Sequence, residues 1–362
     1  MNNENQTIHK SDDNLTIYGW NEKLNQLKQE SIYSALAHGR VSIVHRTCYE
    51  VISGNGLFQC ELTGNMMYGK SDDELPCTGD WVIFQPFDEH KGIIVDSLPR
   101  ERTLYRKKSG TVADKQAIAS YVDKAFIVQS LDDNFNVRRV ERFMVQIMEE
   151  NISSVLVLNK ADLDFDRQSV EEQIKHISSQ IPVFFTSIHQ LETIVRLRKS
   201  ISEGETVVFV GSSGVGKSSL VNALCEKPVL LTSDISLSTG KGRHTSTRRE
   251  MVLMDSSGVL IDTPGVREFG LAIDNPDSLA EVLEISDYAE LCRFKDCKHI
   301  NEPGCAALEA VNSGVLDYKV YASYLKLRRE AWHFSASEHE KRKKEKSFTK
   351  LVEEVKNRKA NR

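Results

Sequence analysis

The fold of this chain follows from residues 211–218, which read Gly-Ser-Ser-Gly-Val-Gly-Lys-Ser and match the pattern G-x-x-x-x-G-K-[ST]. The apolar run 206–210 precedes this stretch, and Leu220, Val221 and Leu224 follow it at helical spacing. A strand, a glycine-rich loop and a helix in this order direct backbone N–H groups and a helix N-terminus toward phosphates. We therefore predict a doubly wound P-loop α/β domain that binds a nucleoside triphosphate.

Two side chains of this loop and a second motif are expected to meet at the phosphates. Lys217 should reach the β- and γ-phosphates, and the Ser218 hydroxyl should coordinate Mg²⁺. Further along, an apolar run ends in Asp-Thr-Pro-Gly, from Asp262 to Gly265. A carboxylate at the end of a neighbouring strand lies near the phosphate-bound metal, and Gly265 can present its N–H to the γ-phosphate. Without the phosphate loop, the same four residues would indicate only a turn.

A third motif, Asn-Lys-Ala-Asp at 159–162, directly follows another apolar run. The Asp162 carboxylate can accept two hydrogen bonds from the N1–H and amine of guanine, which adenine does not offer. Asn159 is expected to brace the loop and the base, and the Lys160 stem to pack along the ring. Thr186 and Ser187 end the next apolar run and are expected to support the loop near the guanine oxygen. Together the three motifs predict GTP as the nucleotide.

The order of these motifs is unusual, because the guanine-specifying loops precede the phosphate loop. A circular permutation assembles the same site, since cutting the chain at a surface loop leaves the strand positions unchanged. The expected nucleotide contacts are Asn159, Lys160, Asp162, Thr186, Ser187, Gly211, Ser212, Ser213, Gly214, Val215, Gly216, Lys217, Ser218, Ser219, Asp262 and Gly265.

The catalytic groups are expected to be Lys217, Ser218, His244 and Thr247. Residues 239–249 form a polar segment without an apolar period. Such a loop can place a threonine on Mg²⁺ when GTP is bound, and Thr247, with Thr245 as the alternative, is expected to do so. Val266 stands where many GTPases carry a glutamine that orients water, so intrinsic hydrolysis should be slow. His244 could supply the missing group or could simply face solvent.

Four potential metal ligands follow the spacing Cys292-x4-Cys297-x-His299-x5-Cys305. Three thiolates and an imidazole form a closed tetrahedral set, which predicts one structural Zn²⁺. The alternative is three buried free cysteines and a surface histidine. Arg293 and several other charged residues between the ligands make this segment a poor core.

The rest of the chain suggests the domain layout. Short β-rich runs between Gly39 and about Arg100, without a helix, favour an OB-type β-barrel. We predict a polar leader (1–38), the barrel (39–112), a circularly permuted GTPase domain (113–272), a mostly helical zinc-binding domain (273–335) and a basic tail (336–362).

Composition excludes several classes of protein. Hydrophobic residues are 40% and charged residues 27% of the 362 residues, which excludes a fibrous or wholly disordered chain. No apolar run approaches the length of a membrane-spanning helix, and the polar N-terminus is unlike a secretory signal, so a cytoplasmic location is expected. The net charge is −5, although residues 341–362 carry ten Lys and Arg against three Glu.

In their order, these motifs resemble those of one family, the ribosome small-subunit-dependent GTPase A family of circularly permuted bacterial GTPases. The resemblance extends from about Arg40 to about Arg329 and includes the segment Gly-Arg-His-Thr-Ser-Thr at 242–247. It implies an OB barrel, a permuted GTPase domain and a zinc-binding domain. It also implies late maturation of the small ribosomal subunit, with GTP hydrolysis stimulated by that particle. Ser246 departs from the family pattern, in which threonine is common.

Residue chemistry gives separate support for RNA as a partner. OB barrels and zinc modules often hold RNA, and basic residues follow the barrel at Arg100, Arg102 and Arg106. We therefore expect a monomeric GTPase that binds the small ribosomal subunit and its rRNA and assists maturation. The alternative is a GTP-binding RNA scaffold with negligible turnover. A third hypothesis, a P-loop kinase, has no use for the Asn-Lys-Ala-Asp motif.

Overall fold

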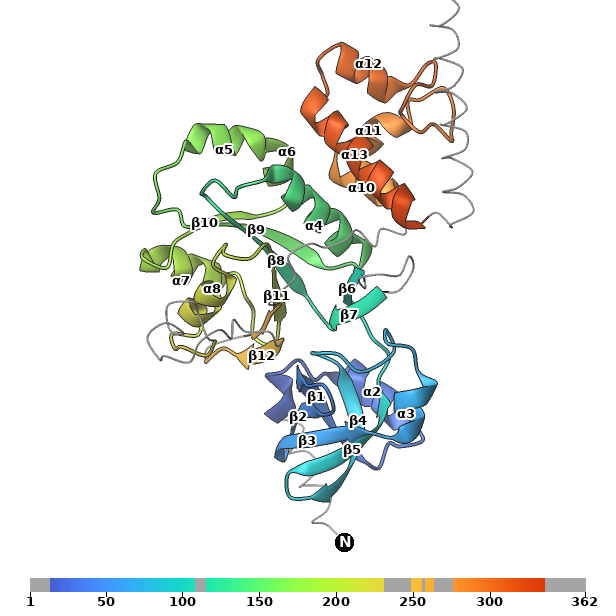
Figure 1. Ribbon diagram of the computed structural model, residues 1–362, viewed down its shortest axis with the longest axis vertical. Coiled ribbons are helices and arrows are strands. Elements are labelled where there is room, and N and C mark those ends of the chain that lie inside the picture. Colours follow the sequence, from blue (N-terminus) through green and yellow to red (C-terminus); the bar gives the residue numbers. More distant parts are fainter. Residues whose placement is uncertain (1–13, 108–114, 231–248, 256–257, 264–275, 336–362) are drawn as a thin grey trace, which may run out of the picture. The chain divides into compact units, whose positions relative to one another are not determined.

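The computed structural model describes residues 14–107, 115–230, 249–255, 258–263 and 276–335; Figure 1 shows its helices and strands. The chain forms two compact units. The first comprises residues 1–106 and 115–269, and the second comprises residues 107–114 and 270–362. The first unit contains a β-barrel and an α/β sheet. The finer domain limits expected from the sequence stay predictions.

The barrel is built from five strands and closes on itself. The strands are β1 (Ala37–Val44), β2 (Tyr49–Ser53), β3 (Gly56–Leu62), β4 (Trp81–Asp88) and β5 (Lys91–Ser97). Their order is β1-β2-β3-β5-β4, and β1 also pairs with β4, which leaves no free edge. The turn between β2 and β3 is tight, because Ser53 pairs with Gly56 across it.

Gly39 allows β1 to take part in this closure. It pairs with Ser53 of β2 on one side and with Val82 of β4 on the other. A Cβ at this position would lie 2.4 Å from the carbonyl oxygen of Ile52. Only glycine permits so close an approach between the strands.

The expectation that the barrel contains no helix is wrong. Helix α3 (Gly64–Gly69) follows β3, and the Thr63 hydroxyl accepts a hydrogen bond from the backbone N–H of Met66 over 3.3 Å. Met66 is buried in the barrel core. A helix this short has too few residues for an apolar period, so hydrophobic periodicity could not predict it.

The segment before β1 packs against the barrel. It includes helix α2 (Glu22–Glu30), which begins after its N-cap residue Asn21. Leu15, Trp20 and Leu24 are buried, and the ring of Trp20 lies 4.9 Å from that of Trp81 in β4. The leader is polar in overall composition, but its few apolar side chains pack against the barrel.

The α/β part of the first unit has the strand order β10-β9-β8-β11-β13-β12. All pairs in this part are parallel except that between β12 and β13. The strands are β8 (Lys124–Ser130), β9 (Ser153–Asn159), β10 (Val183–Thr186), β11 (Thr206–Val210), β12 (Glu250–Leu253) and β13 (Val259–Asp262). A separate two-stranded sheet, formed by β6 (Leu104–Lys107) and β7 (Lys115–Ala119), precedes β8 in the chain. The helices are α4 (Val137–Glu149), α5 (Arg167–Gln173), α6 (Lys175–Ser178), α7 (Leu191–Lys199) and α8 (Lys217–Leu224).

Burial on both faces explains why these strands are continuously apolar. Every residue of β11 is buried, and so are all residues of β8 after Lys124. Helices α7 and α8 share a core with Phe126 and Phe209, whereas α4 packs on β8 and β9 (Figure 1). Parallel strands covered by helices need apolar residues in both directions, which confirms the predicted doubly wound arrangement.

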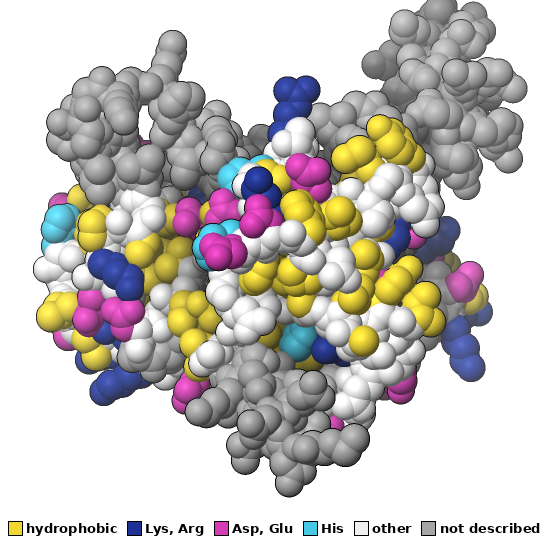
Figure 2. Space-filling model, turned by 90° about the horizontal axis from the view of Figure 1, so that it is seen from below, with side chains coloured by type: hydrophobic (Ala, Val, Ile, Leu, Met, Phe, Trp, Pro, Cys, Tyr) yellow, Lys and Arg dark blue, Asp and Glu magenta, His cyan; other side chains and the backbone are white. Residues whose placement is uncertain are grey.

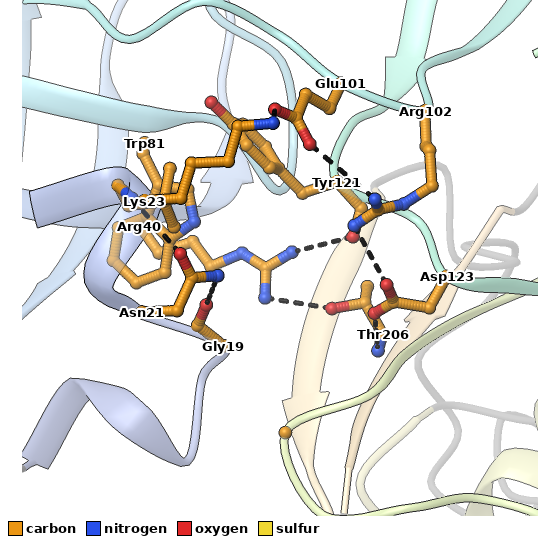
Figure 3. A pocket seen from close by; sticks show the side chains of 12 residues that line it. Gly19, Asn21, Lys23, Arg40, Trp81, Glu101, Arg102, Tyr121, Asp123 and Thr206 are labelled. Carbon is orange, nitrogen blue, oxygen red and sulfur yellow. Dashed lines mark hydrogen bonds and ion pairs between the residues drawn. The ribbon is translucent and has the colours of Figure 1, made fainter. Parts of the chain in front are cut away.

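A small polar pocket marks the junction of the barrel with the α/β sheet inside the first unit (Figure 3). The guanidinium groups of Arg40 and Arg102 face it, together with Trp81, Asp123 and Thr206. Arg102 is paired with Asp123 at 2.9 Å. In addition, β1 pairs with β12 at Ile43 and Glu250, so the barrel continues the edge of the sheet.

The second unit is helical, as predicted for the zinc-binding domain. Its helices are α10 (Pro276–Val282), α11 (Ser286–Ala289), α12 (Ala306–Asn312) and α13 (Tyr318–Ser335). Leu279, Leu283 and Leu327 are among the side chains that form its interior. Across both units, the described part of the chain contains no helix long and apolar enough to cross a membrane.

Candidate functional site

The phosphate loop connects β11 to α8, and two of its glycines are required by close contacts. Gly211 has a φ of 151°, and a Cβ there would lie 2.4 Å from the carbonyl oxygen of Val128. Gly216 has a φ of 94°, and its Cβ would meet Asn159 Nδ2 at 2.3 Å. The loop therefore lies directly against β8 and against the Asn-Lys-Ala-Asp motif.

Lys217 stands at the start of α8 with its side chain folded into the loop. Its Nζ donates hydrogen bonds to the carbonyl oxygens of Gly211 and Ser212 over 2.8 and 2.9 Å. Burial lowers the pKa of Lys217, and the nearby Asp262 carboxylate acts in the opposite direction. The loop carbonyls thus hold an ammonium group at the place where phosphate oxygens would be expected.

Ser218 and Asp262 meet as the sequence predicted. The Ser218 hydroxyl donates to Asp262 Oδ2 over 2.9 Å, because β11 and β13 pair in register at Phe209 and Asp262. Asp262 is 1% exposed, and its Oδ1 has no hydrogen-bond partner among the described residues. Burial raises the pKa of this carboxyl group. A buried carboxylate oxygen without a partner, beside a hydroxyl, is a donor set that suits Mg²⁺.

Asn159 joins the guanine-specifying loops to the phosphate loop. Its Nδ2 donates to the carbonyl oxygen of Val215 over 2.9 Å, and its Oδ1 accepts from the Thr186 hydroxyl over 3.2 Å. The backbone N–H of Ala161 also donates to the carbonyl oxygen of Thr186. The structure therefore brings the motifs at 159, 186 and 211 together despite their permuted order.

The Asp162 carboxylate is exposed and accepts a hydrogen bond from the Ser187 hydroxyl. This hydrogen bond lowers the pKa of Asp162, so the group is ionised at neutral pH. Ser187 is itself oriented by the backbone N–H of His189, which donates to its Oγ over 3.0 Å. An ionised acceptor held at the mouth of the loop matches the donors on the guanine edge.

Sequence reasoning missed Asp132, which lies in this region. Lys160 Nζ is paired with Asp132 Oδ2 at 2.8 Å, so in this structure the lysine stem is fixed by a carboxylate from the loop after β8. The signal was available in principle, because Asp132 follows a parallel strand at the same sheet edge as the motifs. Three predicted contacts, Gly265, His244 and Thr247, lie outside the described residues, as do Thr245 and Val266.

The four predicted zinc ligands meet in the second unit between α11 and α12. Their ligand atoms all lie within 4.8 Å of one another. His299 Nδ1 is 3.5 Å from the sulfurs of both Cys292 and Cys305, and these two sulfurs are 4.0 Å apart. Zn–S bonds of ~2.3 Å in a tetrahedron place sulfurs ~3.8 Å apart. The cluster therefore fits a tetrahedral metal ion.

Glu302 shapes the loop that carries His299. Its carboxylate accepts hydrogen bonds from the backbone N–H groups of Lys298, Ile300 and Asn301 over 2.9–3.1 Å. These bonds, led by that from Ile300, lower the pKa of Glu302 to about 2. In addition, the Tyr321 hydroxyl of α13 donates to the carbonyl oxygen of His299 over 2.8 Å. The ligand loop is thus ordered by the Glu302 carboxylate and by helix α13.

Comparisons with known proteins agree with this geometry. Residues 97–272 match the family model of the RsgA GTPase. Small ribosomal subunit biogenesis GTPase RsgA 1 of Bacteroides thetaiotaomicron is 76% identical over 361 residues, which cover 100% of both chains. The RsgA of Methanosarcina acetivorans is 38% identical over 338 residues, covering 90% of this chain and 89% of its own.

Two crystal structures have a similar fold. YjeQ from Thermotoga maritima aligns with a TM-score of 0.63 at 25% identity and covers 82% of this chain and 98% of its own. YloQ, a circularly permuted GTPase, aligns with a TM-score of 0.60 at 21% identity and covers 85% of this chain and 99% of its own. Together with the permuted site and the full-length identity, these findings confirm the resemblance noted in the sequence: the chain belongs to the RsgA GTPase family and is a GTPase.

Proposed function

We propose that this GTPase assists the biogenesis of the small ribosomal subunit, binds the RNA of that particle and is stimulated by it. The observation that carries the proposal is the 76% identity, over the whole chain, with a protein named for small ribosomal subunit biogenesis. Identity of this extent includes the barrel and the zinc-ligand unit as well as the nucleotide site. A cytoplasmic location is part of the proposal, and the monomeric state stays a prediction.

In the proposed chemistry, each nucleotide contact has a separate role. Asp162 reads the guanine edge, Lys217 binds the β- and γ-phosphates, and Ser218 with Asp262 would hold Mg²⁺. Bound Mg²⁺ neutralises charge on the transferring phosphoryl group. Lys217 Nζ donates to two loop carbonyls in this structure. When nucleotide binds, phosphate oxygens would replace these two acceptors, so the lysine would stay hydrogen-bonded.

A groove on the barrel supports RNA binding. Its lining includes His45 and Arg46 from the β1–β2 turn, His90 from the β4–β5 turn and Lys91 at the start of β5. Glu50 also lines the groove and is hydrogen-bonded to His45 over 2.7 Å. Leu57 of β3 also lines the groove and is half exposed. On the face seen in Figure 2, hydrophobic side chains lie beside both acidic and basic ones. The cations Arg46 and Lys91 beside exposed apolar surface suit single-stranded RNA, whose backbone is anionic and whose bases are flat.

The second unit offers an independent basic surface. The guanidinium carbon of Arg293 lies 5.4 Å from the ring centroid of Phe294, which is 41% exposed. Lys295 and Lys298 are close by in the same ligand loop. We propose that this loop contacts RNA, and that the metal stiffens it for that purpose.

The connection along the chain suggests how the bound nucleotide could affect the binding of RNA. The chain leads from Asp262, through residues outside the described part, to α10 of the second unit. We propose that a γ-phosphate orders the segments around 240–249 and 262–268 and so alters how the two units are presented to RNA. By reciprocity, the subunit must then favour the GTP-bound form.

Co-sedimentation with purified small subunits tests this proposal. Association should be tight with a non-hydrolysable GTP analogue and weak with GDP, and GTP turnover should rise when subunits are added. Equal association in both nucleotide states would contradict the switch. If subunits leave turnover negligible, the scaffold hypothesis is favoured instead.

A second experiment concerns the source of stimulation. His244→Ala should lose the stimulated turnover and retain nucleotide and particle binding, because Val266 cannot orient water and another group is needed. Unchanged stimulation in this variant would remove His244 alone from the proposal.

A further inference from the structure

The side chain of Ser212, the second residue of the phosphate loop, is held by two groups that belong to none of the sequence motifs. Arg139 Nη1 donates to Ser212 Oγ over 3.0 Å, and Asn134 Nδ2 donates to the same oxygen over 3.2 Å. Both donors come from the loop and first helical turn after β8. The phosphate loop is therefore fixed from outside as well as by its own glycines.

Arg139 is itself positioned by local structure. The Asn136 side chain caps α4 and accepts a hydrogen bond from the backbone N–H of Arg139 over 3.2 Å. Arg139 Nη1 also donates to Asn134 Oδ1 over 3.1 Å. Since both Asn134 and Arg139 donate to Ser212 and contact each other, the three side chains form one closed network. The positive charge of the guanidinium group strengthens its hydrogen bonds.

This network connects to both halves of the nucleotide site. The carbonyl oxygen of Ser212 accepts a hydrogen bond from Lys217 Nζ, so Ser212 links Arg139 to the phosphate-binding lysine. In the same loop, Asp132 accepts from the backbone N–H of Asn134 over 3.0 Å and is paired with Lys160. Arg139 acts on the phosphate half, whereas Asp132 acts on the base half.

We propose that Arg139 is a positioning residue of the phosphate loop, which presets the conformation that receives the diphosphate of GDP or GTP by holding Ser212. The proposal goes beyond the GTPase activity, because it assigns a residue of α4 that no motif contains. A preset loop loses less conformational freedom when the nucleotide binds, so affinity rises without a direct contact to the ligand.

The first test compares Arg139→Ala with Arg138→Ala. Arg138 is the preceding residue of the same helix, is exposed, and its replacement causes the same change in charge. Loss of a charge-assisted hydrogen bond should raise the Kd of GDP and GTP about tenfold in Arg139→Ala, measured by calorimetry, and leave it within twofold in Arg138→Ala. The preference for GDP over IDP, which lacks the exocyclic amine, should stay unchanged because the base half is intact.

Steady-state kinetics separate positioning from catalysis and from loss of structure. A residue that acts equally on the bound ground state and the transition state should raise KM about tenfold and leave kcat unchanged. A fall in kcat at constant KM would overturn the positioning role, because it would mean a contact made only in the transition state.

A double-mutant cycle supplies the second variant. Ser212→Ala removes the shared acceptor, so combining it with Arg139→Ala should weaken GDP binding no more than either change alone. Additive losses would overturn the proposal, and so would GDP affinities of Arg139→Ala and Arg138→Ala that agree within twofold.

Discussion

The guanidinium group of Arg40 in β1 donates from Nη1 to Thr206 Oγ1 in β11 over 2.9 Å, and so connects the barrel to the strand that precedes the phosphate loop (Figure 3). Arg40 also donates to the carbonyl oxygens of Gly79, Tyr121 and Tyr18 and lies over the ring of Trp81. Burial lowers the pKa of Arg40 to about 10, so the group is still charged at neutral pH. One buried cation therefore satisfies acceptors from four segments of the first unit.

Replacing Arg40 should destabilise the first unit. Arg40→Ala leaves these buried acceptors without donors, and we expect the free energy of unfolding to fall by about 3 kcal/mol or more. Arg46→Ala, at an exposed position in the turn after the same strand, should change it by less than about 0.5 kcal/mol. Chemical denaturation measures both variants, and equal stabilities would show that the Arg40 network is energetically neutral.

Asp162→Asn should weaken GTP binding about 10²-fold or more without unfolding the protein. An amide offers one donor and one acceptor, whereas the guanine edge needs two acceptors. Asp164→Asn, at an exposed position two residues further along, is the matched control and should bind GTP normally. Calorimetry that finds unchanged affinity in Asp162→Asn would remove this loop as the reader of the base.

Ser218→Ala should abolish GTP hydrolysis, because the hydroxyl beside Asp262 is expected to hold Mg²⁺. Lys217→Ala should have the same effect through loss of charge at the phosphates. Ser218→Thr keeps the hydroxyl and should retain turnover. Phosphate release measured with small subunits present checks all three, and near-normal turnover in Ser218→Ala would place the active site elsewhere.

The Cys292, Cys297, His299 and Cys305 cluster should hold one zinc ion per chain and stabilise the second unit. Cys292→Ser or Cys305→Ser should lose the metal, whereas Cys48→Ser, outside the cluster, should keep it. Elemental analysis of protein purified without chelator is the measurement. Absence of zinc together with freely titratable thiols at all three cysteines would refute the site.

His38 should make the first unit less stable in mild acid. Burial, with a smaller effect of Lys28, lowers the pKa of His38 to about 3. Between this value and the unfolded value of ~6.5, the unfolded chain binds a proton that the folded chain does not, so stability falls as the pH falls below ~6.5. From pH 7 to pH 5 this costs about 2 kcal/mol.

The matching measurement is the free energy of unfolding at both pH values for the wild type and for His38→Asn. The decrease on acidification should be about 2 kcal/mol smaller in the variant, since its side chain does not titrate in this range. Parallel decreases in the two proteins would exclude His38 as the cause.

The amino-acid sequence by itself determined the class of fold and the GTPase family, and it predicted the four residues that meet in the Cys/His cluster. The roles expected of Gly211, Gly216, Lys217, Ser218 and Asp162 depend on short-range spacing and on the strand before each motif. Parallel strands end at a common edge, so motifs placed after separate strands must meet there even when their order is permuted. Helix α4 and its N-cap residue Asn136 were predictable from the sequence, because the apolar period of a helix and its capping are local properties.

Tertiary structure alone decided the contacts that join these parts. Arg40 and Thr206 are 166 residues apart in sequence, and Arg139 and Ser212 are 73 apart. An arginine in a strand or a helix looks like any exposed cation until the fold surrounds it, since its partners are carbonyl and hydroxyl oxygens that every segment carries. Hydrogen bonds to such common groups produce no recognisable sequence pattern. Which atoms pair is decided only when packing brings remote segments within about 3 Å of each other.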